Sequence, residues 1–182
     1  MKQIIFILFF FLPTLAYSQE PISFTEVVDV AGVDKKELFI RGREWFNENF
    51  KSSNDVLQIN DKETGELVGK GYFIVNCVYT MMGKRVVPAG VYFQVSIWVK
   101  DGKYKYEFTN FNVPGSHDMT TLMINLGYIT SSDETDKKFP NVPQKRMNES
   151  YLSVKNSTIS KCNLLIESLK LKMSNIAKST DW

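Results

Sequence analysis

The sequence predicts an α+β protein that combines an antiparallel sheet with one helix near its start and a longer helix at its end. Apolar and polar side chains alternate with a period of two over most of residues 55–113, which is the pattern of half-buried strands. Apolar side chains recur every three or four positions in residues 34–50 and from residue 148 onward, which is the pattern of amphipathic helices. Turn residues separate the alternating segments, so neighbouring strands are expected to form hairpins.

Residues 1–18 are predicted to be a secretory signal peptide. Lys2 precedes the apolar run Ile4–Leu12, which is shorter than the roughly 20 residues that a bilayer-spanning helix needs. Small residues follow at the two positions that signal peptidase reads, so we expect cleavage after Ser18. Residues 19–182 are then expected to form a single domain that is exported to the periplasm or the extracellular space.

The charge balance argues against nucleic acid as a partner. The chain has 22 Lys and Arg residues against 20 Asp and Glu residues, and its formal net charge is +2. Proteins that bind nucleic acid gain most of their affinity from a strongly basic surface that neutralises phosphates. The near-neutral charge therefore predicts no nucleic-acid partner. No segment after the signal peptide is apolar enough to span a membrane, so no transmembrane segment is predicted either.

The only cysteines are Cys77 and Cys162. An exported protein resides in an oxidising compartment, where these two residues can form a single disulfide. The alternative is that both are small buried side chains with free thiols, because free cysteine is among the most buried residue types. The sequence leaves both interpretations open.

The first strand and the first helix are predicted near the start of the mature chain. Residues 21–30 alternate and then become β-branched, which indicates a strand. Asp34 and Glu37 have the spacing of a capping box, in which Asp34 accepts from amides of the first turn and Glu37 reaches back. A helix is therefore expected from this point to about Phe50.

A hairpin is predicted over residues 56–79, with a polar turn at residues 61–65. Its second strand contains Gly69-Lys70-Gly71, which suggests a phosphate-binding loop at first sight. Such a loop needs Ser or Thr after the Lys and a helix after the loop, whereas here Gly71 follows and a strand is expected. The glycines instead indicate a bulge or a close approach to the backbone.

The next hairpin is centred on Asp101-Gly102, a dipeptide typical of a type I′ turn. Residues that face each other across a two-residue turn have a constant sum of residue numbers, and this fixes the register. The expected pairs are Lys100 with Lys103, Val99 with Tyr104, Trp98 with Lys105 and Ile97 with Tyr106.

This register separates a core face from a polar face. The core face is expected to carry Val95, Ile97, Val99, Tyr104, Tyr106 and Phe108. The polar face carries the lysines, with Trp98 beside Lys105 and with Tyr92 opposite Phe111 further from the turn. Trp98 either packs under lysine stems or under the long loop, or it forms with Lys105, Tyr92 and Phe111 a shallow surface for a ligand or a protein partner. These four residues are the candidate binding site.

Residues 113–146 are predicted to form a long loop before the last helix. A connection of this length inside a compact domain is uncommon and is either functional or mobile. From about Asn148 apolar side chains recur at helical spacing between lysines, which predicts a helix that packs its apolar side on the core.

The element order and three segments resemble a family of secreted bacterial domains of unknown function with a TATA-binding-protein-like (TBP-like) fold. The segments are LFIRGREWF (residues 38–46), GELVGKGYF (65–73) and VKDGKYKYEFTNF (99–111). The resemblance covers residues 24–111 and the terminal helix. It implies a curved antiparallel sheet in the order β-α-β-β-β-β-α, with both helices on one face and the other face open. The family has no catalytic motif to carry over, and the resemblance does not imply DNA binding, because a fold does not determine a function.

The sequence offers little for catalysis. His117 is the only histidine, which excludes a His-rich metal site, and Ser116-His117-Asp118 are neighbours in the chain rather than a triad that converges in space. No metal and no cofactor are predicted. We therefore expect a non-catalytic envelope module that binds a protein, peptide or glycan through the open sheet face or the long loop. The alternative is a small periplasmic hydrolase of unrecognised type.

Overall fold

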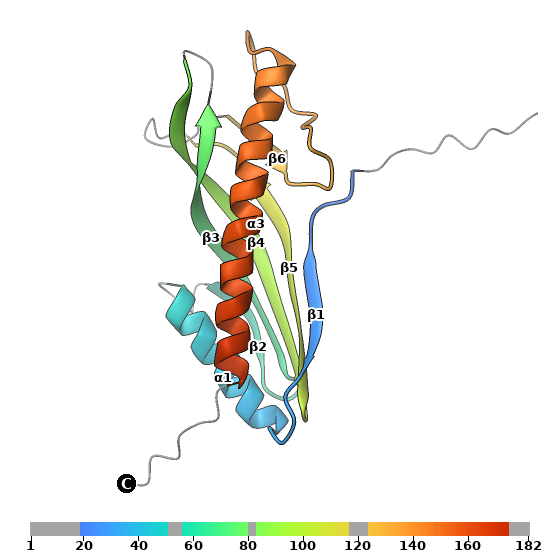
Figure 1. Ribbon diagram of the computed structural model, residues 1–182. Helices are drawn as coiled ribbons and strands as arrows, with labels where there is room; N and C mark the ends of the chain where they lie inside the picture. Colours follow the sequence, from blue (N-terminus) through green and yellow to red (C-terminus); the bar gives the residue numbers. More distant parts are fainter. Residues whose placement is uncertain (1–18, 51–55, 80–82, 117–123, 175–182) are drawn as a thin grey trace, which may run out of the picture.

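The computed structural model describes residues 19–50, 56–79, 83–116 and 124–174. The elements along the chain are β1 (Phe24–Asp29), α1 (Lys35–Asn49), β2 (Leu57–Asp61), β3 (Glu66–Tyr79), β4 (Arg85–Lys100), β5 (Lys103–Val113), β6 (Gly127–Tyr128) and α3 (Gln144–Ser174). The strands form an antiparallel sheet in the order β1-β5-β4-β3-β2, and β6 pairs with β5. Both helices lie on one face of the sheet, as Figure 1 shows. The expected α+β fold is confirmed.

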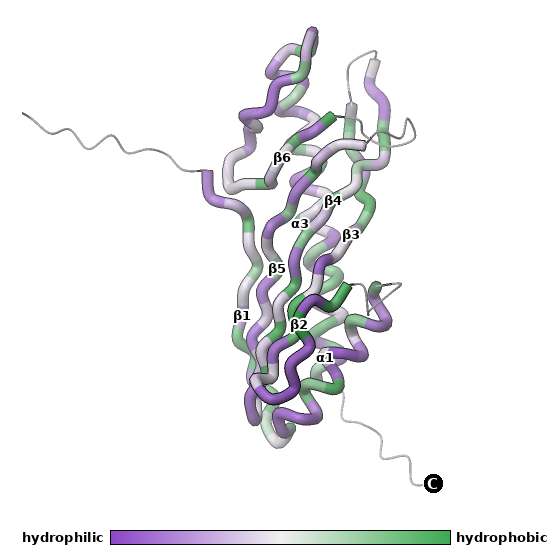
Figure 2. The backbone as a smooth tube through the Cα atoms, turned by 180° about the vertical axis from the view of Figure 1, so that it is seen from behind, coloured by the Kyte–Doolittle hydropathy of each residue, from purple (hydrophilic) through white to green (hydrophobic). Residues whose placement is uncertain are grey.

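The two faces of the sheet differ in what covers them. The side that carries the helices is termed the inner face, and its side chains form the core. Figure 2 shows the opposite side, termed the outer face, where the strands lie in front of α3. Burial alternates accordingly along β5, because Tyr104, Tyr106 and Phe108 are buried whereas Lys103 and Lys105 are exposed.

Two carboxylates fix the start of α1. Asp34 Oδ1 accepts a hydrogen bond from the amide of Glu37 at 2.7 Å, as the sequence predicts. Asp101 Oδ1 accepts from the amide of Lys35 at 2.8 Å, which ties the helix to the tip of the β4–β5 hairpin. These bonds satisfy amides that a helix N-terminus leaves without partners. Glu37 does not reach back as expected, since its Oε1 pairs with Arg41 Nε at 2.8 Å.

The glycines of β3 make room for aromatic rings of the core. A Cβ atom on Gly69 would lie 2.6 Å from Phe46 Cε1, and one on Gly71 would overlap the ring of Phe93. A close approach to the backbone is therefore the correct interpretation of both glycines. Lys70 lies between them as an exposed strand residue, so the segment is not a phosphate loop.

The register between β4 and β5 agrees with the sequence prediction from the turn as far as the pair Gln94 and Thr109. The turn itself differs. Gly102 has a positive φ of 74° and Asp101 does not, whereas a type I′ turn needs positive φ at both residues.

Phe111 lies in the core, and the prediction that it faces outward opposite Tyr92 was wrong. The backbone of Asn110 has φ 59° at a bulge in β5, and Tyr92 pairs with Asn112 instead. One extra residue in a strand moves every later side chain to the other face of the sheet. Phe111 is 0% exposed and stacks on Phe93 with ring centroids 5.6 Å apart.

Cys77 and Cys162 are free and buried, so the disulfide interpretation was wrong. Cys77 Sγ lies 3.8 Å from the carbonyl oxygen of Ser150 in α3. Cys162 lies twelve residues after Ser150 in the same helix, and an α-helix rises about 1.5 Å per residue. About 18 Å of helix therefore separates Cys162 from the point where Cys77 contacts α3. A disulfide needs Cα atoms within about 7 Å of each other.

The part of the long loop that the structure describes packs on α3. Lys155 Nζ donates to the carbonyl oxygens of Ser131 and Ser132, at 2.8 and 2.9 Å. The same atom pairs with Asp133 Oδ1 at 2.8 Å. A buried lysine that makes three such contacts fastens the loop to the helix.

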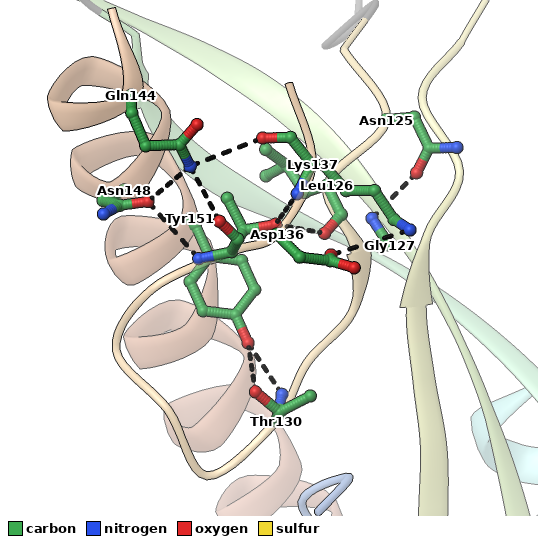
Figure 3. A network of polar contacts seen from close by, with 10 residues as sticks. Asn125, Leu126, Gly127, Thr130, Asp136, Lys137, Gln144, Asn148 and Tyr151 are labelled. Carbon is green, nitrogen blue, oxygen red and sulfur yellow. Dashed lines mark hydrogen bonds and ion pairs between the residues drawn. The ribbon is translucent and has the colours of Figure 1, made fainter. Parts of the chain in front are cut away.

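A second set of contacts holds the loop nearer the start of α3, as Figure 3 shows. Tyr151 Oη accepts from the amide of Thr130 at 2.7 Å. Gln144 Nε2 donates to the carbonyl of Thr135 at 2.7 Å, and Asn148 Oδ1 accepts from the amide of Thr135 at 3.3 Å. The helix begins at Gln144, four residues before the predicted start. Its first turn forms earlier because Gln144 and Asn148 take part in this network.

We expect Phe111→Ala to lower the free energy of unfolding by about 3–5 kcal/mol, because it removes a buried ring and leaves a cavity. Tyr92→Ala should lower it by about 1 kcal/mol, since Tyr92 is 52% exposed and its ring packs on Tyr72 at the surface. Chemical denaturation of both variants measures the difference. Equal losses would contradict the bulge at Asn110.

Both thiols should be unreactive in the native protein. Burial raises the pKa of Cys77 to about 11 and the pKa of Cys162 to about 12, and the thiolate is the reactive form. An aromatic disulfide reagent at pH 8 should modify neither thiol in the folded chain and both after unfolding without reductant. If the unfolded, unreduced chain contained no free thiol, the two cysteines would be bonded.

Candidate functional site

The candidate site lies on the outer face near the turn of the β4–β5 hairpin. Trp98 in β4 has Glu66 of β3 as its Cα partner on one side and Lys105 of β5 on the other. Its indole Nε1 donates to Glu66 Oε1 at 3.0 Å. Lys105 Nζ lies 5.1 Å from the centre of the Trp98 ring. The side chain is therefore held on both sides by cross-strand neighbours.

An open hollow of about 470 Å³ lies beside this tryptophan. It is termed the Trp98 hollow, and its lining residues are Val27, Trp98, Lys100, Lys103, Tyr104 and Lys105. Val27 comes from β1 and is 59% exposed, so an apolar side chain forms the side of the hollow nearest the margin of the sheet.

Positive charge gathers at the hollow. Within the described part of the chain, none of Lys100, Lys103 and Lys105 forms an ion pair. Lys100 and Lys103 are also direct cross-strand partners, and like charges in that arrangement destabilise a sheet. Asp29 is the Cα partner of Lys103 and supplies the nearest negative charge on β1. An anion in the hollow would relieve the repulsion between the lysines.

The structure brings together two of the four predicted site residues. Trp98 and Lys105 are in contact as expected. Tyr92 lies on the same face six residues along β4, about 20 Å away at 3.3 Å per residue, where its ring packs on Tyr72 at 4.9 Å. Phe111 is in the core and cannot take part.

Sequence reasoning missed the contribution of the first strand. Val27 lines the hollow because β1 pairs with β5 and Val27 is the Cα partner of Lys105. Nothing in a local pattern shows which strand pairs with which over this separation. The contributions of Lys100 and Lys103 were visible, because the predicted register already placed both on the polar face.

The described residues offer no recognisable metal centre. Within that part of the chain, no group of three or more His, Cys, Asp and Glu residues lies close enough to hold a metal ion. His117 and Asp118 lie outside the described residues, so the predicted hydrolase alternative is untested. Of the helices that the structure describes, none is long and apolar enough to cross a membrane.

Residues 24–113 match the model of a family described as a domain of unknown function with a TBP-like fold, DUF4468. The chain carries a DUF4468 domain. The matched range runs from the start of β1 to the end of β5, so the DUF4468 domain contains every residue that lines the Trp98 hollow.

Two bacterial crystal structures resemble this DUF4468 chain. One is a DUF4468 family protein from Bacteroides ovatus ATCC 8483, with 13% identity, a TM-score of 0.58 and coverage of 87% of this chain and 89% of that chain. The other is a TBP-like protein from Parabacteroides distasonis ATCC 8503, with 12% identity, a TM-score of 0.59 and coverage of 85% and 94%. Each alignment covers a larger share of this chain than residues 1–113 make up. The structural likeness therefore extends beyond the end of β5 and the range that the family model matches.

These comparisons establish the fold of the DUF4468 domain and leave its function to be argued from the site. At such low identity a structural likeness carries no activity or ligand from one chain to another. No curated protein matches the chain.

Proposed function

We propose that this chain is an exported, non-catalytic binding module of the bacterial cell envelope, and that the Trp98 hollow binds an anionic partner. The carrying observation is the set of three lysines without ion-pair partners among the described residues, gathered around one open hollow. The signal-peptide pattern of residues 1–18 supports export, although those residues lie outside the described part of the chain.

The shape of the hollow supports binding rather than catalysis. It is an open depression on a sheet face, whereas enzymes enclose their substrates in pockets where titratable groups converge. The charged residues that line it are all lysines, and the carboxylate of Glu66 beside it accepts a hydrogen bond from the Trp98 indole. Lysine ammonium groups on flexible stems suit the recognition of carboxylate or phosphate groups of an envelope protein, peptide or glycan.

The proposal predicts that removal of the three lysines abolishes most binding to anionic polymers. Titration with poly-glutamate and with polygalacturonate, each at low ionic strength, should give an affinity that falls at least about tenfold in the triple variant Lys100→Ala, Lys103→Ala, Lys105→Ala. Calorimetry measures the affinity, because replacing Lys105, which lies over the Trp98 ring, would itself alter a fluorescence signal.

The matched control loses the same charge elsewhere. Lys138, Lys145 and Lys161 are exposed and lie away from the hollow, so their joint replacement by alanine should leave the affinity within about twofold. Equal losses in both triple variants would reduce the interaction to net charge and contradict the proposed site. Stronger binding of poly-glutamate than of polygalacturonate would favour a protein or peptide partner over a glycan.

A further inference from the structure

The strand β1 is an edge strand of the sheet and lies beside the Trp98 hollow. It pairs with β5 on one side. On its other side no described strand or helix lies next to it, and Figures 1 and 2 agree in placing it at the margin. A strand at a margin presents unpaired backbone donors and acceptors, which another extended segment can use.

The backbone groups that face away from the sheet can be assigned. The amide of Val30 donates to the carbonyl of Gly102 at 2.7 Å, and the amide of Ile22 donates to the carbonyl of Ile129 at 3.0 Å. Even-numbered residues therefore bond toward the sheet at both ends of β1. Since bonding alternates along an antiparallel strand, the amides and carbonyls of Thr25, Val27 and Asp29 point away from β5.

A second depression lies on the inner side of the same strand. It is an open groove of about 530 Å³ between β1 and α3, termed the β1–α3 groove. Its lining residues are Ser23, Phe24, Thr25, Tyr106, Asn163, Ile166, Glu167 and Lys170. The Trp98 hollow and the β1–α3 groove therefore lie on opposite faces of the sheet, on either side of one unpaired edge.

The charges in the groove are already neutralised within the chain. Lys170 Nζ lies 2.6 Å from Glu26 Oε2, and Tyr106 Oη donates to the same carboxylate at 2.6 Å. The hydrogen bond from Lys170, and after it the one from Tyr106, hold the pKa of the Glu26 carboxyl group below its ordinary value, so this carboxylate stays charged at neutral pH. What an incoming side chain would meet beside this pair is the apolar surface of Phe24 and Ile166.

We propose that β1 is the docking edge for an extended peptide segment of a partner protein, which adds to the sheet as a further strand. Side chains of such a strand point alternately to the two faces. Those on the inner side would enter the β1–α3 groove and are apolar, and the one opposite Val27 on the outer side is acidic. The acidic position rests on the proposed function of the Trp98 hollow, whereas the backbone pairing and the groove do not.

The acidic position follows from the charges around the edge. Lys105 is the Cα partner of Val27, and an added strand would lie two strand spacings from β5, about 9.5 Å, which a lysine and a glutamate can bridge over a valine. Positions opposite Asp29 and Thr25 are less suitable, because Asp29 is acidic and Thr25 Oγ1 donates to Glu107 at 3.4 Å. The favoured segment therefore has one carboxylate between two apolar residues.

A second copy of the chain suits this edge less well. Antiparallel pairing of two β1 strands about Val27 would place Asp29 of each copy opposite Thr25 of the other. Thr25 is the Cα partner of Glu107, so two carboxylates would approach each other while the lysines stayed without partners. The charge pattern thus favours a peptide of different sequence.

The test uses the end-blocked synthetic peptide STSLELSTS and calorimetric titration of the mature protein. Val27→Pro removes an amide that faces away from the sheet and leaves the β1–β5 bonds intact, because proline is tolerated on edge strands. We expect it to weaken binding at least about tenfold, and Val27→Thr, which keeps the amide, to weaken it by no more than about twofold. Circular dichroism verifies that both variants are folded.

A second measurement avoids any change in the protein. Methylating the backbone nitrogens of the peptide that would face β1 should abolish binding to the parent chain, and replacing the central Glu by Lys should weaken it at least about tenfold. Binding of the methylated peptide at the parent affinity would overturn strand addition. Failure of the unmodified peptide to bind at millimolar concentration would overturn it as well.

The remaining outcomes separate this inference from the proposed function. If the variant Lys100→Ala, Lys103→Ala, Lys105→Ala loses the peptide while Val27→Pro and the methylated peptide keep it, the anionic hollow stands and strand addition is overturned. If only Val27→Pro and methylation abolish binding, strand addition stands and the anionic hollow fails. A concentration-dependent dimer of the parent chain that Val27→Pro dissociates would make a second copy the occupant and overturn the peptide.

Discussion

The pairing of β5 with β4 on one side and with β1 on the other is the constraint on which the rest of the molecule depends. Strand side chains alternate between faces, so one register places Tyr104, Tyr106 and Phe108 in the core and Lys103 and Lys105 on the outer face. The two helices cover the inner face alone, and the lysine face stays open. Core and candidate site are thus two consequences of the same set of hydrogen bonds.

The loop before α3 and the hairpin tip show how polar contacts complete this architecture. Asp101 at the hairpin tip caps α1, and Lys155 of α3 fastens the loop through three oxygen contacts. Both side chains use their charge within the fold. The lysines of the Trp98 hollow form no ion pair among the described residues, and this contrast supports the proposal that the hollow binds an external anion.

Much of the fold was predictable because the local periodicity of apolar side chains indicates its strands and helices. The Asp101-Gly102 turn and the alternation around it gave the β4–β5 register, and with it the contact between Trp98 and Lys105. The prediction failed at Phe111 because one bulged residue, Asn110, is enough to reverse the face of the strand beyond it. No hydrophobic pattern marks such a residue in advance.

The other failures concern contacts between distant parts of the chain. A disulfide between Cys77 and Cys162 was open in the sequence, and only the tertiary structure excludes it, because Cys77 of β3 lies beside Ser150 whereas Cys162 lies twelve residues further along α3. The contribution of Val27 to the hollow depends on the pairing of β1 with β5, which joins residues about 80 positions apart. Local rules give which residues alternate, and the strand order decides which of them meet.

Amide hydrogen exchange along β1, followed by nuclear magnetic resonance in the free protein, tests the central claim most directly. An unpaired strand edge lies between the Trp98 hollow and the β1–α3 groove. This arrangement predicts that the amides of Thr25 and Val27 exchange at least about a hundredfold faster than those of Glu26 and Val28, which bond to β5. Equal protection of all four amides would mean that the edge is already paired, and it would contradict both the free strand and its proposed role.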